Sequence, residues 1–292
     1  MKIIFMSSSS FGEATLRLLH EQSFCSISYV YTKPPSRSGR GKALKKNHIH
    51  SLADDLGIEV CCFQSLKDVE IPRGQYVLVV VSYGIIIPQR ILSSAIYALN
   101  IHPSLLPRWR GAAPIQHALL NGDKKTAVCI IEVVKEVDAG DIFVQELVDI
   151  DLINDNYLIL LDKLSNIGAR LMVNVLKDID NIVPVPQSDK GLLYADKIPK
   201  YELSFIEHTA FFIDRYVKAM MGAFIKINDI TVKLIYTEYI CNDSSYESGK
   251  IINHFNDELI VATSKDLLKI IKLQLPGKYP ITGKDFINSY LK

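Results

Sequence analysis

The chain has 292 residues, of which 48% are hydrophobic and 22% charged, and its 33 basic and 32 acidic side chains leave a formal net charge of +1. This composition excludes a disordered chain, because the apolar content suffices for at least one large core. It also excludes a uniformly basic nucleic-acid binder, because a net charge near zero gives no overall attraction to phosphate. At about 150 residues per domain, the length predicts two domains.

No membrane contact is expected from the sequence. The longest apolar stretch, residues 76–87, has about 12 residues where a spanning helix needs about 20, and the start MKIIFMSSSS turns polar too soon for a signal peptide. The five cysteines lack CxxC spacing, which disfavours structural zinc and a disulfide framework. We therefore expect a cytoplasmic protein with reduced thiols.

The first part of the chain alternates strands with helices. We predict strands at residues 2–5, 26–31, 58–61, 76–81, 98–102, 127–134 and 142–150. Helices are predicted at 11–20, 42–56, 88–95, 113–120 and 154–177, with a loop at 32–41. The alternation predicts an α/β domain with a parallel sheet and helices on both faces. The strand at 142–150 is expected to form a hairpin with the strand before it.

The second part has a different pattern. Residues 181–200 contain three prolines and a glycine, which is typical of an interdomain linker. After a helix near 207–221, short strands separated by turns, one of them at Asn228–Asp229, predict a small barrel. TGKD at 282–285 has capping-box spacing for a last helix. The predicted domains are 1–182 and 206–292, joined by a linker at 183–205.

Asn100 and His102 are the first candidates for chemistry. They lie two apart in a predicted strand, so both side chains leave the same face, and they lie at its carboxyl end, where ligands bind in open α/β sheets. An amide donor beside an imidazole can stabilise negative charge on a carbonyl oxygen. The spacing alone fits a structural role equally well, with His102 capping the following loop and Asn100 making a turn bond.

Two further segments carry charge. The turn EVDAGDI at 136–142 holds Asp138 and Asp141, and a carboxylate near His102 could orient the ring and favour its charged form, although most such turns are solvated loops. The loop KPPSRSGRGKALKK at 33–46 has six basic side chains and no acidic one. It is either a loop that grips phosphates or a solvated basic face.

Several motifs resemble one enzyme family. HPSLLPRWRGAAPIQ (102–116) resembles the signature of the 10-formyltetrahydrofolate-dependent formyltransferases, and its second half is similar to the methionyl-tRNA formyltransferases in particular. GRGKAL (39–44), VVVSYGIIIP (79–88) and VDAGDI (137–142) agree with the family in order and spacing, and residues 273–289 resemble its C-terminus. KAMMGAF (218–224) departs from the family's usual NPWPG-like stretch.

The resemblance implies a fold and an activity. The fold would be a Rossmann-like N-terminal formyltransferase domain and a smaller C-terminal OB-like β-barrel that binds tRNA. The activity would be transfer of formyl from 10-formyltetrahydrofolate, without a metal, to the methionyl amine of initiator Met-tRNA for translation initiation, by a monomer. Alternatives are a formyl-folate hydrolase, a transferase acting on a nucleotide or sugar amine, and a noncatalytic RNA-binding protein.

The resemblance also implies roles for individual residues. The catalytic residues would be Asn100, His102 and Asp138, with Asn100 and protonated His102 donating to the formyl oxygen and Asp138 holding His102. Tetrahydrofolate would be bound by Ser104, Leu105, Leu106, Pro107, Tyr83, Gly84, Ile85, Ile86 and Ile87. The tRNA would be bound by Arg37, Arg40, Lys42 and Lys45.

Overall fold

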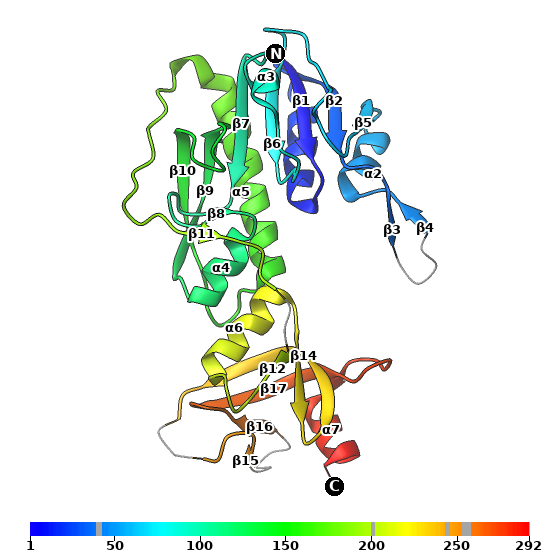
Figure 1. Ribbon diagram of the computed structural model, residues 1–292, viewed down its shortest axis with the longest axis vertical. Coiled ribbons are helices and arrows are strands. Elements are labelled where there is room, and N and C mark those ends of the chain that lie inside the picture. The colour runs from blue at the N-terminus through cyan, green and yellow to red at the C-terminus, as the bar shows by residue number, and fades with distance from the viewer. Residues whose placement is uncertain (39–42, 200–201, 243–245, 253–257, 292) are drawn as a thin grey trace. The chain divides into compact units, whose positions relative to one another are not determined.

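The computed structural model describes residues 1–38, 43–199, 202–242, 246–252 and 258–291. The chain divides into two compact units. Figure 1 shows the chain coloured by residue number from the N-terminus to the C-terminus. The first unit comprises Met1–Pro114, Lys125–Asp149 and Leu161–Ala195, and the second comprises Ile115–Lys124, Ile150–Leu160 and Asp196–Lys292. In the described part of the chain, no helix has both the length and the apolar character needed to cross a membrane.

The first unit is built on a seven-stranded sheet. In spatial order its strands are β10 (Ile142–Asp149), β9 (Lys125–Glu132), β7 (Tyr97–His102), β6 (Val77–Val81), β1 (Lys2–Ser7), β2 (Ser26–Thr32) and β5 (Val60–Cys62). The five strands from β7 to β5 are parallel, and β9 runs antiparallel to both β7 and β10. The predicted parallel sheet and the predicted hairpin are therefore both confirmed.

Helices cover both faces of this sheet (Figure 1), as predicted. They are η1 (Ser10–Gly12), α1 (Glu13–His20), α2 (His48–Asp55), α3 (Gln89–Leu92), α5 (Tyr157–Asp178), which belongs to this unit from residue 161 on, and η2 (Ile179–Asn181). On one face α5 packs against β7 and β9, where Gly168 lies next to Ile101 and Val128. On the other face, Leu66 and Ile91 pack against the inward side chains of β1 and β6.

The segment from residue 32 to 56 differs from the prediction. The predicted loop and helix start are replaced by a small hairpin, in which β3 (Ser36–Ser38) pairs with β4 (Ala43–Lys45). The helix begins only at His48, because the side chain of Asn47 accepts a hydrogen bond from the His50 backbone N–H at 3.0 Å. Asparagine is among the strongest N-cap residues, so it fixes the helix start six residues later than expected.

The second unit is a curled sheet accompanied by helices, consistent with the predicted OB-like barrel (Figure 1). Its strands are β12 (Glu202–Leu203), β13 (Ala223–Ile227), β14 (Ile230–Ile240), β17 (Leu267–Gln274), β16 (Leu259–Ala262) and β15 (Ile251–Ile252), with β18 (Ile281–Thr282) paired to β17. Its helices include α4 (Pro114–Asn121), α6 (Ala210–Met220) and α7 (Gly283–Tyr290). The turn at Asn228 and Asp229 is confirmed, with φ of 45° and 59°, and Thr282 and Asp285 form the predicted capping box.

Two segments from the predicted first domain, 115–124 and 150–160, cluster with the second unit. Side chains of α6 bind both of them: Arg215 donates to the Leu119 carbonyl at 3.1 Å, and Lys218 donates to the Leu152 carbonyl at 3.0 Å. Conversely, residues 183–195 of the predicted linker lie with the first unit. There β11 (Tyr194–Ala195) pairs with β8 (Arg110–Gly111).

Candidate active site

Asn100 and His102 lie at the carboxyl end of β7. Because side chains alternate along a strand, both point from the same face of the sheet. His102 is buried, with 4% of its surface exposed, and Asn100 is half-buried. The strand therefore holds an amide and an imidazole side by side, as the spacing predicted.

Asp138 lies in the turn between β9 and β10. Its φ of +52° is in the left-handed region, which costs on the order of 1 kcal/mol and persists only where the surroundings impose it. The turn folds back onto the end of β9, where the Glu132 N–H donates to the Asp141 carbonyl at 2.9 Å. Gly140 permits this approach, since a Cβ there would collide with the Glu132 carbonyl.

The three predicted catalytic residues meet at the Asp138 carboxylate. Asn100 Nδ2 donates to Oδ1 at 3.2 Å, and His102 Nδ1 lies 3.4 Å from Oδ2. The Gly111 backbone N–H donates to Oδ2 at 2.9 Å. Three nitrogens, two from β7 and one from β8 (Arg110–Gly111), thus converge on one carboxylate and fix its orientation.

The second ring nitrogen of His102 is also engaged. Nε2 lies 2.9 Å from the carbonyl oxygen of Trp109, a residue with φ of +65°. A carbonyl can only accept, so Nε2 carries the proton in this arrangement. With the Asp138 carboxylate facing Nδ1, a doubly protonated ring is the form in which both nitrogens donate.

Asn100 keeps donor capacity in this arrangement. An amide nitrogen carries two hydrogens, and the bond to Asp138 uses one of them. The other is a candidate donor to a carbonyl oxygen bound beside the imidazole and the carboxylate. Such a set can stabilise negative charge on that oxygen and accept a proton from an attacking group.

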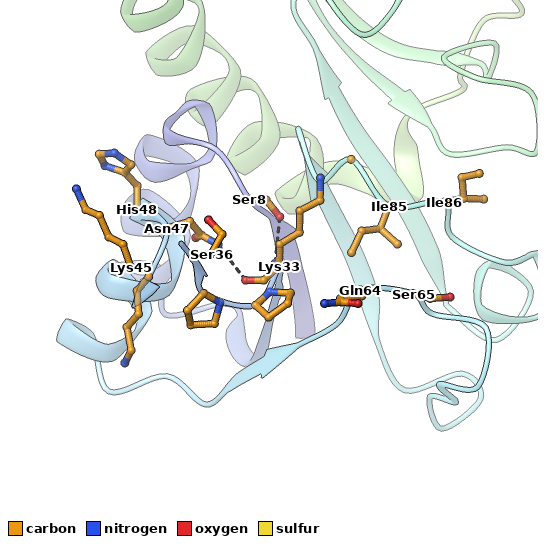
Figure 2. Close-up of a pocket in the computed structure, with 14 residues that line it drawn as sticks. Ser8, Lys33, Ser36, Lys45, Asn47, His48, Gln64, Ser65, Ile85 and Ile86 are labelled. Carbon is orange, nitrogen blue, oxygen red and sulfur yellow. Dashed lines mark hydrogen bonds between the residues drawn. The ribbon is translucent and has the colours of Figure 1, made fainter. Parts of the chain in front are cut away.

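A large pocket opens at the same edge of the sheet, at the carboxyl ends of β1, β2, β5 and β6 (Figure 2). Its volume of about 840 Å³ lies within the range of ligand sites. The sheet order changes direction between β1 and β6, and ligands bind at such switch points in open α/β sheets. The basic side chains that line it are Lys33, Lys45, Lys46 and His48, alongside polar residues that include Ser8, Ser36, Asn47, Gln64 and Ser65.

Lys33 lines this pocket and lies between Ser8 and Ile85 in Figure 2. Its backbone is fixed on both sides: the N–H donates to Ser8 Oγ at 3.2 Å, and the carbonyl accepts from Asn47 Nδ2 at 3.1 Å. Its ammonium lies over Gly84, where a Cβ would come within 2.8 Å of Nζ. Gly84, with φ of +68°, thus allows a cation to approach the backbone of the loop after β6.

The predicted folate-binding residues separate into three groups: some line the large pocket, some lie in the core, and the segment 104–107 lies elsewhere. Gly84, Ile85 and Ile86 line the large pocket, whereas Ile87 packs into the core beside β6. Tyr83 is buried, and burial raises the pKa of its phenol, which therefore stays protonated. The segment Ser104–Pro107 lies apart from that pocket, with Leu105 and Leu106 packed against β9.

A second hollow of about 310 Å³ lies against β7. Ala98 and Leu99, directly before Asn100, line it, together with the backbone that leads from Glu132 toward the Asp138 turn. Gln89 and Leu92 of α3 form another wall. No motif in the sequence predicts this hollow, whose lining includes none of residues 83–87.

The predicted tRNA-binding residues are only partly described. Lys45 lines the large pocket, and Arg37 lies exposed on β3. Arg40 and Lys42 lie outside the described residues. Lys33, Lys46 and His48 add three basic side chains to the pocket that the assignment did not name, although all but His48 belong to the basic loop at 33–46.

Comparison with known proteins gives the family. The formyl transferase family matches residues 1–176, and its C-terminal domain matches residues 198–291. The chain belongs to the formyl transferase family. A methionyl-tRNA formyltransferase of Ehrlichia canis is 40% identical over 298 residues, covering 99% of this chain and 97% of that protein. A methionyl-tRNA formyltransferase of Rickettsia bellii is 38% identical over 301 residues, with the same coverage.

Solved structures share the fold. The sugar 3N-formyl transferase WlaRD, solved with dTDP and 5-N-formyl-THF, has a TM-score of 0.71 at 17% identity, covering 96% of this chain and 99% of that chain. HypX from Aquifex aeolicus, in complex with tetrahydrofolic acid, has a TM-score of 0.62 at 16% identity and covers all of this chain and 48% of that chain. The predicted fold class and family are thus confirmed.

Proposed function

We propose that this formyl transferase transfers the formyl group of 10-formyltetrahydrofolate to the methionyl amine of initiator Met-tRNA, in the cytoplasm and for translation initiation. The observation that carries the proposal is the meeting of an amide, an imidazole and a carboxylate at the end of β7. Full-length similarity to proteins named methionyl-tRNA formyltransferases supports this acceptor rather than another amine.

The reaction moves an acyl group between two nitrogens. The neutral methionyl amine attacks the formyl carbon, a new C–N bond forms, and the formyl oxygen gains negative charge. The second N–H of Asn100 donates to that oxygen. The Asp138 carboxylate takes the amine's proton, directly or through a water molecule. The bond from the formyl carbon to the folate nitrogen then breaks, and this nitrogen takes the proton back from Asp138, directly or through the water molecule, which releases tetrahydrofolate and restores the carboxylate.

His102 acts in this scheme mainly through its charge. Its Nε2 already faces the Trp109 carbonyl and its Nδ1 faces Asp138. To donate directly to the formyl oxygen, as the sequence suggested, the ring would have to give up one of these partners. A protonated ring stabilises the developing oxyanion and fixes the Asp138 carboxylate without leaving either of them.

We assign the large basic pocket to the acceptor end of the tRNA. Lys33 and Lys45 can neutralise phosphate charge, whereas the Lys46 ammonium is paired with the Asp54 carboxylate at 2.5 Å. No acidic side chain lines the pocket within the described part of the chain. The hollow beside Ala98 and Leu99 is the candidate site for the folate ring system, because the same strand carries Asn100 one residue later.

The test of the function uses purified protein and 10-formyltetrahydrofolate. We expect rapid formylation of initiator Met-tRNA, slower formylation of elongator Met-tRNA, and little release of tetrahydrofolate in water alone. Folate release without a tRNA requirement would instead identify a hydrolase. Formylation of a nucleotide sugar amine in preference to Met-tRNA would identify a sugar transferase, and RNA binding without any formyl transfer would identify a noncatalytic protein.

Lys45→Ala is expected to weaken use of the tRNA and leave use of the folate unchanged. The substitution removes one phosphate-neutralising charge, so kcat/KM for Met-tRNA should fall several-fold, and its slope against log salt concentration should become shallower by about one. Lys67→Ala is the matched control, since this exposed lysine of the same unit does not line the pocket. Equal losses toward folate and tRNA would contradict the assignment of the pocket.

A further inference from the structure

All four hydrogen-bonding positions of the Gln187 side chain are filled. Its Nε2 donates to the backbone carbonyls of Asp138 at 2.8 Å and Gly140 at 2.7 Å. Its Oε1 accepts from Arg110 twice, from Nε at 3.0 Å and from Nη2 at 2.8 Å. A glutamine amide offers two donor hydrogens and two acceptor lone pairs, so this side chain is saturated.

The orientation of the Gln187 amide is set by its partners. The guanidinium of Arg110 can only donate, and the two carbonyls can only accept. A flipped amide would oppose N–H to N–H on one side and oxygen to oxygen on the other. The side chain is therefore a fixed bridge between Arg110 and the turn that carries Asp138.

Both ends of this bridge reach the proposed catalytic residues. Arg110 stands between Trp109, whose carbonyl faces His102 Nε2, and Gly111, whose N–H donates to Asp138 Oδ2. The loop that orients the imidazole and the turn that presents the carboxylate are thus tied together by a single glutamine amide. The Gln187 amide can therefore affect the distance between the His102 imidazole and the Asp138 carboxylate without touching a substrate.

The backbone near Gln187 is itself anchored to the same unit. Two residues earlier, Val185 exchanges a pair of 2.9 Å hydrogen bonds with Ile142, just beyond the Asp138 turn. Further on, the Leu193 carbonyl accepts from the Arg110 N–H at 3.0 Å. Gln187 is half-buried although its neighbours at 186 and 188–190 are exposed. This burial indicates that Gln187 is held by specific contacts to the first unit and does not lie in a free linker.

We propose that Gln187 is a positioning residue for formyl transfer, which holds Asp138 in line with His102 and Asn100 by clamping the Asp138 turn to Arg110. This inference rests on the proposed function, because it requires Asp138 to act in the reaction. Asp138 has an unfavourable positive φ that must be imposed by its surroundings. Two donated hydrogen bonds to this short turn supply part of that constraint.

Loosening the clamp should affect the chemical step more than substrate binding. Displacement of a reacting group by about 1 Å can cost on the order of 10²-fold in rate. Gln187→Glu keeps an acceptor for Arg110 but places a carboxylate oxygen against the two carbonyls. We expect kcat to fall by about 10–100-fold, with KM for Met-tRNA and for 10-formyltetrahydrofolate within about threefold of the wild type. Gln187→Met removes all four hydrogen bonds while keeping a side chain of similar length. It should lower kcat to the same extent and leave both KM values nearly unchanged.

The matched control is Gln22→Glu. The Gln22 side chain also donates to a backbone carbonyl, that of Leu18 at 3.0 Å, and it lies at the end of α1. This variant should have the kcat of the wild type. Each variant is checked by circular dichroism at the assay temperature, and a loss of kcat that disappears once rates are normalised to the folded fraction would overturn the proposal.

A double-mutant cycle separates positioning from general support of the fold. Residues that act through one another lose their separate effects when combined. In an Asp138→Asn background, Gln187→Glu should therefore lower kcat by less than about threefold. An undiminished effect there, or wild-type kcat in both Gln187 variants, would overturn the inference and leave the proposed function standing. Wild-type kcat in Asp138→Asn alone would overturn the proposed catalytic role itself.

Discussion

Replacing Asn100 with alanine is expected to lower kcat for formylation of Met-tRNA by about 10²–10³-fold at saturating substrates. Both ring nitrogens of His102 face protein acceptors, whereas Asn100 has one N–H that no acceptor takes among the described residues, so Asn100 is the direct donor to the formyl oxygen. Charge develops on that oxygen in the transition state. The loss should therefore appear in kcat, and KM for either substrate should change little.

The control for Asn100→Ala is Asn166→Ala. Asn166 is an exposed asparagine on α5 whose Nδ2 bonds to the Asp162 carbonyl at 2.9 Å, within its own helix. Surface substitutions of this kind change stability by about 0.5 kcal/mol or less, and kcat should not move. If Asn100→Ala kept wild-type kcat while Asp138 variants lost it, His102 would have to be the donor, and its ring would have to leave the Trp109 carbonyl.

Much of this fold could be predicted from the sequence because local pattern and tertiary environment agree. The run VLVVV at β6 is buried on both faces, which is what an apolar β-branched run requires. The Asn228–Asp229 pair tolerates positive φ and makes the hairpin turn expected of it. Asn100 and His102 lie on one face because a strand alternates. In each case a few consecutive residues carry the whole signal.

The helix start at residue 42 was predicted wrongly because the helical preference of these residues competes with strand pairing in the same segment. Residues 42–47 have a composition compatible with a helix, but Asn47 caps the helix that starts at His48, and residues 43–45 pair in a hairpin instead. The N-cap preference is local and visible in the sequence. The cap at Asn47 identifies the helix start only if one also knows that residues 43–45 pair as a strand.

Parts of the site have no sequence signal. Trp109 and Gly111 contribute a backbone carbonyl and a backbone N–H, which any residue possesses. Gln187 lies in a segment whose prolines suggest a linker, and its partners are up to 77 residues away in the chain. Long-range hydrogen bonds of this kind follow from the packing of β8, β11 and the Asp138 turn. They cannot be read from composition or periodicity.

Asp138→Asn tests the centre of the constellation and is expected to have the largest effect, a loss of about 10²–10⁴-fold in kcat. The substitution removes the negative charge that faces His102 and the group that accepts the amine's proton. It also disrupts the hydrogen bonds, because the carboxylate receives donors on both oxygens. Whichever way the new amide turns, its NH₂ group faces a donor, either Asn100 Nδ2 or the Gly111 N–H.

Asp141→Asn is the matched control for this prediction. Asp141 lies in the same turn, and its backbone carbonyl, not its side chain, accepts the bond from Glu132. The two variants make the same change of charge three residues apart, so a general effect of charge on tRNA binding would appear in both. A loss confined to Asp138→Asn would identify a local role in proton transfer. Equal and small losses in the two variants would mean that Asp138 only holds the turn in place, and the proton acceptor would then have to be a water molecule oriented by His102 and Asn100.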